Sequence, residues 1–351
     1  MYNTNIYSNI INWYDANKRD LPWRETNDPY KIWLSEVMLQ QTQVNTVIPY
    51  YKKWIERYPN LKSVAAAKLD NLLKLWEGLG YYSRCRNFHT ATQTVMRDYD
   101  GVIPIDKESF QSLSGVGEYT AGAVISIAFD QPFCAIDGNH RRVLYRYLGL
   151  KKKTKRNEIR INSFLKSLVK IDRPGDINQA IMDIGSSICK PRVANCHQCP
   201  LQFSCKAMLM KNPLSYPESM DKNIIPSKEM TAVLIKENDD IYISKRSENG
   251  LLGGLWELPH LQLEMVGNDE IEIKKKVHQV YGHKIKVTKN LGRISHAFTH
   301  LKMNITLFEC EMESKAQQNQ IGRWVSYSEL DNYAFSKANH KLFGLMGKED
   351  V

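Results

Sequence analysis

The first part of the chain, from Ile6 to about Met210, spaces its apolar residues with the period of an α-helix. These residues recur three and four positions apart, which places them on one face of a helix. Prolines and glycines separate the segments that have this pattern. The pattern predicts a compact all-α unit whose helices include residues 32–44, 69–78, 88–96, 121–129 and 178–189.

The last part of the chain, residues 230–351, has the period of a β-strand. A hairpin is predicted at 233–243, because apolar residues alternate there on either side of a polar turn. Further strands are predicted around residues 285–287, 301–307 and 324–325, and one amphipathic helix at 271–282. Strands with a single helix among them predict an α+β fold.

The change of pattern predicts two domains. A chain of 351 residues is longer than one compact core usually occupies. Residues 211–229 show neither period, and we interpret them as a linker. We therefore expect a helical domain at 1–210 and an α+β domain at 230–351.

The charge balance points to a polyanionic partner. The chain has 48 basic and 38 acidic residues, a net charge of +10, and a pI of about 9.1. Charge does not separate DNA, RNA and anionic membranes. The longest apolar stretch, around 121–129, falls far short of the ~20 residues that span a bilayer, which excludes a membrane-spanning protein. The first residues do not have the pattern of a secretory signal, so we expect an intracellular, reducing compartment.

Four of the seven cysteines are close together in the sequence, with the spacing C-x6-C-x2-C-x5-C: Cys189, Cys196, Cys199 and Cys205. An odd total does not suit a disulfide framework. Four nearby thiolates can ligate one soft metal centre, and the candidates are a [4Fe–4S] cluster and a zinc ion. Zinc sites commonly use two C-x2-C pairs and this run has one, so the spacing favours an iron–sulfur cluster in loop 189–205.

A glycine-rich turn lies between two predicted helices, at Gly115, Val116 and Gly117. Glycines allow positive φ and leave the backbone N–H groups accessible, so these groups can bind a phosphate at the start of the next helix. The alternative is an ordinary turn with glycine caps, and the spacing does not decide between them.

Two carboxylates are candidates for acid–base chemistry. Glu36 lies among apolar residues in the segment 33–42, where partial desolvation raises a carboxyl pKa toward that of a general acid. The alternative is a glutamate on a helix surface. Asp137 lies in a segment read Asp-Gly-Asn-His, where it could also simply cap the following helix.

Together and in this order, the glutamate helix, the glycine hairpin, the aspartate turn and the cysteine run resemble the helix-hairpin-helix DNA glycosylases, in particular the adenine-specific MutY family. Nearly the whole chain takes part, including residues 19–24, 40–43, 80–82, 137–139 and 178–180. The resemblance implies a [4Fe–4S] cluster on the four cysteines. It also implies removal of adenine opposite 8-oxoguanine or guanine in double-stranded DNA. We expect a monomer in the cytoplasm, associated with the nucleoid.

The resemblance also implies roles in catalysis. Glu36 matches the catalytic acid, and Asp137, beside Asn139, matches its anionic partner. Tyr119 stands where the bifunctional endonuclease III enzymes have a lysine that forms a Schiff base. A tyrosine cannot form that imine, so we expect a monofunctional glycosylase. Asp183 stands near a position where some relatives have a glutamate, and its role stays open.

Other residues match positions that contact DNA. Gln41 and Tyr81 match residues that wedge into the duplex beside the flipped base, and the hairpin residues 115–117 match the phosphate contact. Trp23 and Arg24 match the adenine pocket. The alternatives are core packing for Trp23 and a polar surface position for Gln41.

The sequence departs from the family pattern at two sites. Ser114 replaces the usual hairpin proline, which reduces rigidity but removes no donor. His140 follows Asp137-Gly138-Asn139 where an apolar residue is more usual, which leaves the local helix geometry in question.

The C-terminal domain resembles the Nudix fold, because a Gly-Gly-Leu-Trp-Glu-Leu-Pro segment precedes its helix. The metal-binding glutamates of the Nudix helix are absent when that helix is aligned to end at Gly282, so we expect no nucleotide hydrolysis. Phe298, Thr299 and His300 match the family loop that reads 8-oxoguanine. The alternative for these residues is the end of a β-strand.

Three other functions are compatible with parts of the sequence. An endonuclease III-type glycosylase/lyase is disfavoured by Tyr119 and by the second domain. A non-catalytic iron–sulfur DNA-binding regulator would need neither Glu36 nor Asp137. A hydrolase of free nucleotides is disfavoured by the missing glutamates of the second domain.

Overall fold

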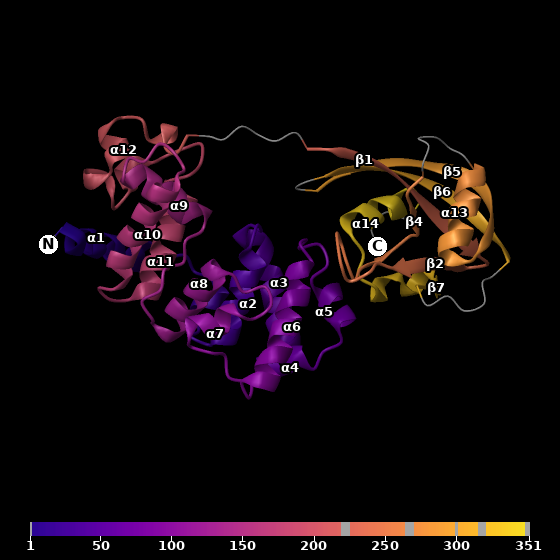
Figure 1. Cartoon of the computed structure of the whole chain (residues 1–351), viewed down its shortest axis with the longest axis horizontal. Coiled ribbons are helices and arrows are strands. Elements are labelled where there is room, and N and C mark those ends of the chain that lie inside the picture. Colours follow the sequence, from indigo (N-terminus) through magenta and orange to yellow (C-terminus); the bar gives the residue numbers. More distant parts are fainter. Residues whose placement is uncertain (1, 219–224, 264–269, 299–300, 315–320, 348–351) are drawn as a thin grey trace. The chain divides into compact units, whose positions relative to one another are not determined.

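The fold is described from a computed structural model that covers residues 2–218, 225–263, 270–298, 301–314 and 321–347. The chain forms two compact units (Figure 1). The first contains residues 1–66 and 87–221, and the second contains residues 67–86 and 222–351.

The N-terminal part is helical, as predicted. Its α-helices are α1 (Tyr2–Asn17), α2 (Pro29–Leu39), α3 (Val44–Arg57), α4 (Leu61–Ala65), α5 (Leu69–Leu75), α6 (Ser83–Asp98), α7 (Lys107–Gln111), α8 (Glu118–Phe129), α9 (Gly138–Tyr147), α10 (Lys155–Val169), α11 (Pro174–Asp183) and α12 (Lys206–Leu209). The π-helix η2 (Ile184–Ile188) continues α11, and short 3₁₀ helices lie at Pro22–Arg24 (η1), Cys196–Gln198 (η3), Gln202–Ser204 (η4) and Pro213–Ser215 (η5). Within the described residues, no helix is both long and apolar enough to cross a membrane.

The helix predicted at 32–44 is shorter than expected. Helix α2 ends at Leu39, a turn follows, and α3 begins at Val44. Gln41 in this turn has φ +57°, a left-handed conformation that a right-handed helix does not contain. The break matters because it exposes Gln41 beside the pocket described below.

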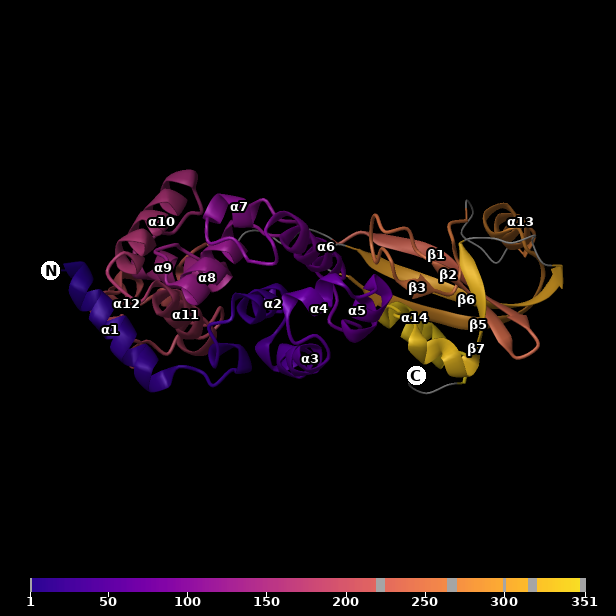
Figure 2. The same cartoon turned by 90° about the horizontal axis from the view of Figure 1, so that it is seen from below.

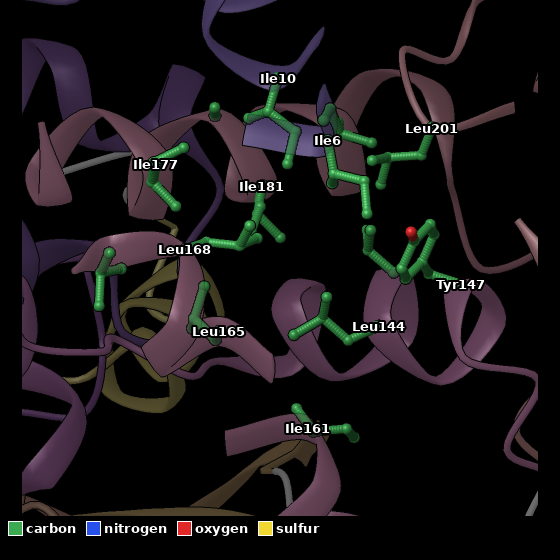
Figure 3. Packing of buried hydrophobic residues seen from close by; sticks show 14 of the residues in the cluster. Ile6, Ile10, Leu144, Tyr147, Ile161, Leu165, Leu168, Ile177, Ile181 and Leu201 are labelled. Atoms are coloured by element: carbon green, nitrogen blue, oxygen red, sulfur yellow. The ribbon is translucent and has the colours of Figure 1, made fainter. Parts of the chain in front are cut away.

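A core of aliphatic side chains holds the helices of the first unit together (Figure 3). Ile10 of α1, Leu144 of α9, Leu165 of α10 and Ile181 of α11 all belong to this core, and each is at most 1% exposed. These residues repeat at helical spacing in their segments, so burying them fixes which face of each helix points inward. The outward and pocket-facing sides of α9 and α11 are fixed by the same packing.

The second unit is built around a mixed β-sheet. Its strands are β1 (Ser227–Glu237), β2 (Asp240–Lys245), β3 (Trp256–Glu257), β4 (His260–Leu261), β5 (Lys284–Ala297), β6 (Lys302–Ser314) and β7 (Gly322–Ser326). The order is β3-β2-β1-β6-β5, with β4 paired to β1 and β7 to β2. Strand β1 runs parallel to β6, and the other pairs are antiparallel. The predicted hairpin at 233–243 is confirmed by the β1–β2 pairing.

Helices cover both faces of this sheet (Figure 2). Helix α13 (Glu270–Tyr281) packs on one face and α14 (Lys337–Gly344) on the other, and the 3₁₀ helix η6 (Tyr327–Asn332) precedes α14. Along β1, Ala232 and Leu234 pack on the α14 side, and Val233 and Ile235 on the α13 side. A central strand buried on both faces explains this continuous apolar run.

Residues 67–86 pack with the C-terminal residues, which the sequence did not predict. The Glu77 Oε1 atom accepts hydrogen bonds at 2.8 Å from the Phe335 backbone N–H and from the His340 Nε2. The Tyr82 hydroxyl donates to the Phe335 carbonyl at 3.4 Å. These partners are more than 250 residues apart in sequence, so no local pattern signals the contact.

The segment interpreted as a linker is partly structured. The Arg146 Nε donates to the Tyr216 carbonyl at 3.0 Å, and the Glu218 backbone N–H donates to the Lys151 carbonyl at 2.9 Å. Strand β1 already begins at Ser227. The start of this segment therefore packs on the first unit, and its end belongs to the sheet.

Candidate active site

A pocket of about 460 Å³ opens in the first unit. It lies among η1, the end of α2 with the turn that follows, and the starts of α8 and α9, together with α11 and η2. Seven residues singled out from the sequence line it: Trp23, Arg24, Glu36, Gln41, Tyr119, Asp137 and Asn139. The fold therefore brings together residues that are spread over more than a hundred positions.

Glu36 reaches the pocket from the buried interior of α2. Asp28 caps this helix by accepting from the Tyr30 backbone N–H, and Pro29 occupies its first position, where a missing N–H costs nothing. Glu36 is 5% exposed, and its Oε2 accepts a hydrogen bond from the Tyr119 hydroxyl at 2.7 Å. Burial raises the pKa of Glu36 to about 7, the Tyr119 hydrogen bond opposes this rise, and the charge of Asp137 adds to it.

Asp137 lies at the N-terminus of α9 and caps it. Its Oδ1 accepts from the His140 backbone N–H and from the His140 Nδ1, both at 2.8 Å, and its Oδ2 accepts from the Asn139 amide at 2.7 Å. Burial alone would raise the pKa of Asp137, but the hydrogen bonds from His140 and Asn139 outweigh burial and lower it. Asp137 is thus both a helix cap and a pocket carboxylate.

The glycine hairpin connects α7 to α8 and positions Tyr119. Gly115 has φ +75°, and a Cβ at this position would lie 2.7 Å from the Asn87 Cβ, so only glycine fits. Gly117 precedes the first residue of α8 without a side-chain cap, which leaves the first N–H groups of the helix available. Tyr119 follows in the first turn, where burial raises its pKa well above the usual value and keeps the hydroxyl protonated.

Arg24 and Asp183 form a bidentate ion pair at the pocket wall. The distances are 2.7 Å from the Arg24 Nη1 to the Asp183 Oδ2 and 3.1 Å from Nη2 to Oδ1. The Arg24 Nε is buried and has no hydrogen-bond partner within the described structure. Trp23 is buried and packs edge-on against Tyr51, so the packing alternative holds for most of its surface, although it also lines the pocket.

Sequence reasoning missed most of the wall that α11 and η2 contribute. Its lining residues are Gln179, Met182, Asp183 and Ser186. They occur at positions i, i+3, i+4 and i+7, which is one face of a helix. This mixed polar face opposite the apolar face of α11 is the signal that could have identified them.

The other residues predicted to contact DNA lie at several different places in the structure. Gln41 is exposed and lines the pocket. Val116 is buried in the hairpin. Tyr81 belongs to the second unit, with φ +47° and 37% of its surface exposed. Phe298 is half-buried and packs on His296, whereas Thr299 and His300 lie outside the described residues.

The four clustered cysteines line one small cavity in the loop that follows η2. All four are free thiols, and the Arg146 Nη1 lies 3.2 Å from the Cys189 Sγ. The positive charge of Arg146 suits a set of thiolates. Within the described parts of the chain, no three His, Cys, Asp or Glu side chains are grouped to hold a single metal ion.

One arginine connects this loop to the pocket. The Arg142 Nε donates to the Cys189 carbonyl and its Nη2 donates to the Asn139 Oδ1, both at 2.7 Å. Asn139 in turn donates to Asp137. Hydrogen bonds therefore run from the cysteine loop to the carboxylate that caps α9.

Comparison with known families supports both halves of this description. Residues 34–167 match a family described as HhH-GPD superfamily base excision DNA repair protein, and residues 230–345 match the NUDIX domain. A solved thermostable thymine-DNA glycosylase superposes with a TM-score of 0.55 and 27% identity, over 59% of this chain and 97% of that one. Endonuclease III in a trapped covalent DNA complex superposes at 0.50 with 22% identity, over 58% of this chain and 94% of that one, which shows a common fold.

Several related proteins match this chain over nearly its whole length. The adenine DNA glycosylase of Rattus norvegicus is 33% identical over 395 residues, covering 95% of this chain and 76% of its own length. The adenine DNA glycosylase of Buchnera aphidicola (subsp. Schizaphis graminum) is 33% identical over 344 residues, covering 95% of this chain and 96% of its own. Both the helical part and the Nudix-like part of this chain are within these matches. The chain therefore belongs to the adenine DNA glycosylase (MutY) family of base excision repair proteins.

Proposed function

We propose that this chain is a monofunctional adenine DNA glycosylase that hydrolyses the N-glycosidic bond of adenine opposite 8-oxoguanine or guanine. One observation carries the proposal. A single pocket holds a carboxyl group with a pKa of about 7, Glu36, and a second one, Asp137, whose pKa is lowered. A pair of carboxylates with separated pKa values supplies one acid and one anion at neutral pH.

Glu36 acts first, as the general acid. Adenine is a poor leaving group as an anion, so it must be protonated as the bond to C1′ lengthens. Protonated Glu36 donates this proton to N7. The Tyr119 hydroxyl, 2.7 Å from the Glu36 Oε2, stabilises the carboxylate that remains.

Asp137 stabilises the sugar once the base departs. The developing oxocarbenium ion is positive, and an ionised carboxylate lowers its energy by electrostatic attraction or transient bonding. Hydrogen bonds from His140 and Asn139 keep Asp137 ionised and hold its orientation. Glu36, now deprotonated, activates the water that adds to C1′.

The proposed substrate is double-stranded DNA with a flipped adenine. The target atom is inaccessible in a stacked duplex, and an adenine turned into the pocket would lie between Trp23 and the carboxylates. Gln41 and Tyr81 are the proposed wedge residues, and the hairpin 115–117 binds a phosphate. Residues 230–351 contain 16 basic and 16 acidic residues, so the whole net charge of +10 lies in residues 1–229. This distribution supports DNA binding chiefly through the helical part.

A glycosylase without lyase activity is favoured over the endonuclease III type. Tyr119 occupies the start of α8 where the resemblance places the lysine nucleophile. No lysine is among the described residues that line the pocket. An amine is required for imine formation.

The C-terminal domain, whose sheet begins at Ser227, reads the base opposite adenine. Phe298, Thr299 and His300 are the proposed contacts. The last two turns of α13 carry Lys275, Lys276 and His278 rather than the acidic residues that a Nudix hydrolase uses to bind magnesium. We therefore propose that the C-terminal domain selects the base opposite adenine and does not hydrolyse nucleotides.

We also propose that Cys189, Cys196, Cys199 and Cys205 hold a [4Fe–4S] cluster. Their convergence on one cavity beside Arg146, without a disulfide, supports this. When bound, the cluster supplies a covalent crosslink that orders loop 189–205. Purified protein should contain about four irons per chain. Stoichiometric zinc without iron after anaerobic preparation would contradict the assignment.

The decisive experiment measures base excision on defined duplexes. Duplexes with adenine, cytosine or thymine opposite 8-oxoguanine or guanine, and an adenine–thymine duplex, are incubated with enzyme and then treated with alkali to cleave abasic sites. We expect cleavage only at adenine in the mispairs, and only after alkali, with little adduct trapped by borohydride. Strand cleavage without alkali would indicate a lyase, and tight binding without abasic sites would indicate a non-catalytic DNA-binding protein.

A further inference from the structure

His140 contacts one of the two pocket carboxylates directly. It is the third residue of α9, and its side chain is fully buried. The Asp137 Oδ1 lies 2.8 Å from the His140 Nδ1 and 2.8 Å from the His140 backbone nitrogen. One residue therefore supplies two donors to the same carboxylate oxygen.

The chemistry of the pair defines where the ring hydrogen lies. An ionised carboxylate only accepts hydrogen bonds, so the His140 Nδ1 must carry a hydrogen. The opposite nitrogen, Nε2, is buried and has no hydrogen-bond partner among the described residues. The ring is therefore oriented by its bond to Asp137.

The remaining oxygen of Asp137 is held by a different residue. The Asn139 amide donates to Oδ2 at 2.7 Å. The Asp137 side chain keeps 24% of its surface exposed and lines the pocket. Donors on both oxygens thus fix the rotamer while one edge of the carboxylate stays accessible to a reacting sugar.

We propose that His140 is a positioning residue for Asp137, whose Nδ1–H holds the carboxylate ionised and oriented toward the pocket. This inference rests on the proposed glycosylase function. His140 holds Asp137 in two ways, through its backbone N–H and through its ring, and of these two only the ring bond can be removed by substitution.

Other charged groups also act on Asp137, and they stay constant in the test. Glu36 of α2, Tyr119 of α8 and Arg142 of α9 interact with it electrostatically. None of them is changed when His140 is substituted. A shift in the titration of Asp137 is therefore attributable to the ring.

Two variants separate hydrogen bonding from packing. His140→Leu fills a similar volume without a donor. His140→Asn places an amide nitrogen on the γ carbon, the atom to which Nδ1 is attached in histidine. Single-turnover excision of adenine opposite 8-oxoguanine is measured for the full-length proteins from about pH 3 to about pH 9, because the lowered pKa of Asp137 places the acidic limb below the ordinary aspartate pKa of about 3.9. Affinity is measured for a duplex whose target nucleotide carries a 2′-fluorine to slow cleavage.

We expect His140→Leu to reduce the rate by about ten- to hundredfold, as for loss of a hydrogen bond to a charged group. Without the Nδ1–H donor the pKa of Asp137 rises, so the acidic limb of the rate profile moves to higher pH. His140→Asn should recover most of the rate and the original limb, and duplex affinity should stay unchanged. A wild-type rate and profile in His140→Leu would overturn the proposal. Equal losses in both variants with an unmoved acidic limb would show a packing role and would also overturn it.

A second measurement is independent of activity. In protein with ¹⁵N-labelled histidine rings, the signal lost in His140→Leu should come from a ring protonated at Nδ1. An unprotonated Nδ1 would refute the bond to Asp137. Failure of the wild-type protein to excise adenine from any mispair would refute the proposed function instead, and the ring signal would still decide whether this bond exists.

Discussion

Glu36 and Asp137 line one pocket, yet the two regions that contain them shift the pKa of a carboxyl group in opposite directions. Glu36 lies within α2, whose backbone N–H groups are used by the helix itself. Its donor is a side chain from another helix, Tyr119. Asp137 lies at the start of α9, where free N–H groups and the side chains of Asn139 and His140 are within reach.

The difference shows that the supply of donors decides whether the effect of burial on the pKa of a carboxyl group is offset. Both groups are desolvated, which raises a carboxyl pKa in each case. For Glu36 desolvation prevails and the pKa reaches about 7. For Asp137 the hydrogen bonds prevail and the pKa falls. A helix interior therefore provides the acid, and a helix N-terminus provides the anion.

The largest expected effect comes from removing the proton donor. Glu36→Gln should slow single-turnover excision by about 10²–10⁴-fold while duplex binding is kept, because an amide cannot deliver the proton. Glu56→Gln, an exposed glutamate of α3, is the matched control and should be normal. Near-normal excision by Glu36→Gln would show that the raised pKa has no catalytic use.

A smaller but still large loss is expected when the anion is removed. Asp137→Asn should slow excision by about a hundredfold or more. Asparagine caps helices as well as aspartate does, so the cap on α9 should be kept, and the bond from the Asn139 amide to Oδ2 is lost. Loss of the Asp137 charge should also lower the pKa of Glu36, since that charge raises it, and the alkaline limb of the rate profile should move to lower pH.

Asp106→Asn provides the control for Asp137→Asn. Asp106 caps α7 by accepting from the Ser109 backbone N–H at 2.8 Å, and it lies outside the pocket lining. If both substitutions affect melting temperature equally and neither slows excision, Asp137 is only a cap.

Tyr119→Phe should have the opposite effect on Glu36. The Tyr119 hydrogen bond lowers the pKa of Glu36, so its loss should move the alkaline limb, otherwise centred near pH 7, to higher pH. The rate below that limb should fall by about tenfold, because the Glu36 carboxylate loses a donor after proton transfer. Rate profiles from pH 5 to 9 measure both effects. A limb that moves down, as in Asp137→Asn, would contradict the described balance.

The smallest effect should come from outside both regions. Thr299→Ala should change the ratio of excision opposite 8-oxoguanine to that opposite guanine by several-fold, as expected for one hydrogen bond. Both pH limbs should stay in place, since neither carboxylate is altered. Parallel single-turnover assays at matched salt measure the ratio. An unchanged ratio would show that Thr299 does not recognise 8-oxoguanine and would contradict the role proposed for residues 298–300.

Point substitution is a better test of the second unit than truncation. Residues 67–86 pack with residues 222–351, and Glu77 accepts hydrogen bonds from both His340 and Phe335. Removing the C-terminal part would expose this surface. A loss of activity on truncation would then report on folding as well as on lesion reading.

Much of the fold was predictable because its signals are local. The hairpin at 233–243 was recognised from its apolar residues on either side of a polar turn, and α13 was recognised from the helical repeat of its one buried face. The end of α2 at Leu39 was missed, since Gln41 adopts a left-handed turn that its residue type does not announce. Asp183 was named from the sequence without a role, and the lining residues Gln179, Met182 and Ser186 were missed as pocket residues, because a polar helix face looks the same whether it meets solvent or a pocket.

The sequence by itself determined which residue types were present and the period of each element: two carboxylates, a glycine hairpin, four clustered cysteines, and a change from helices to strands. It did not determine the charge state of either carboxylate. The Glu36 pKa depends on burial and on a tyrosine 83 residues away, and the Asp137 pKa depends on which way the His140 and Asn139 side chains turn. The hydrogen bonds from His140 and Asn139 to Asp137 are local to the start of α9. Burial of Glu36 and its hydrogen bond from Tyr119 arise only when the helices pack, so tertiary structure decided which carboxyl group is the acid.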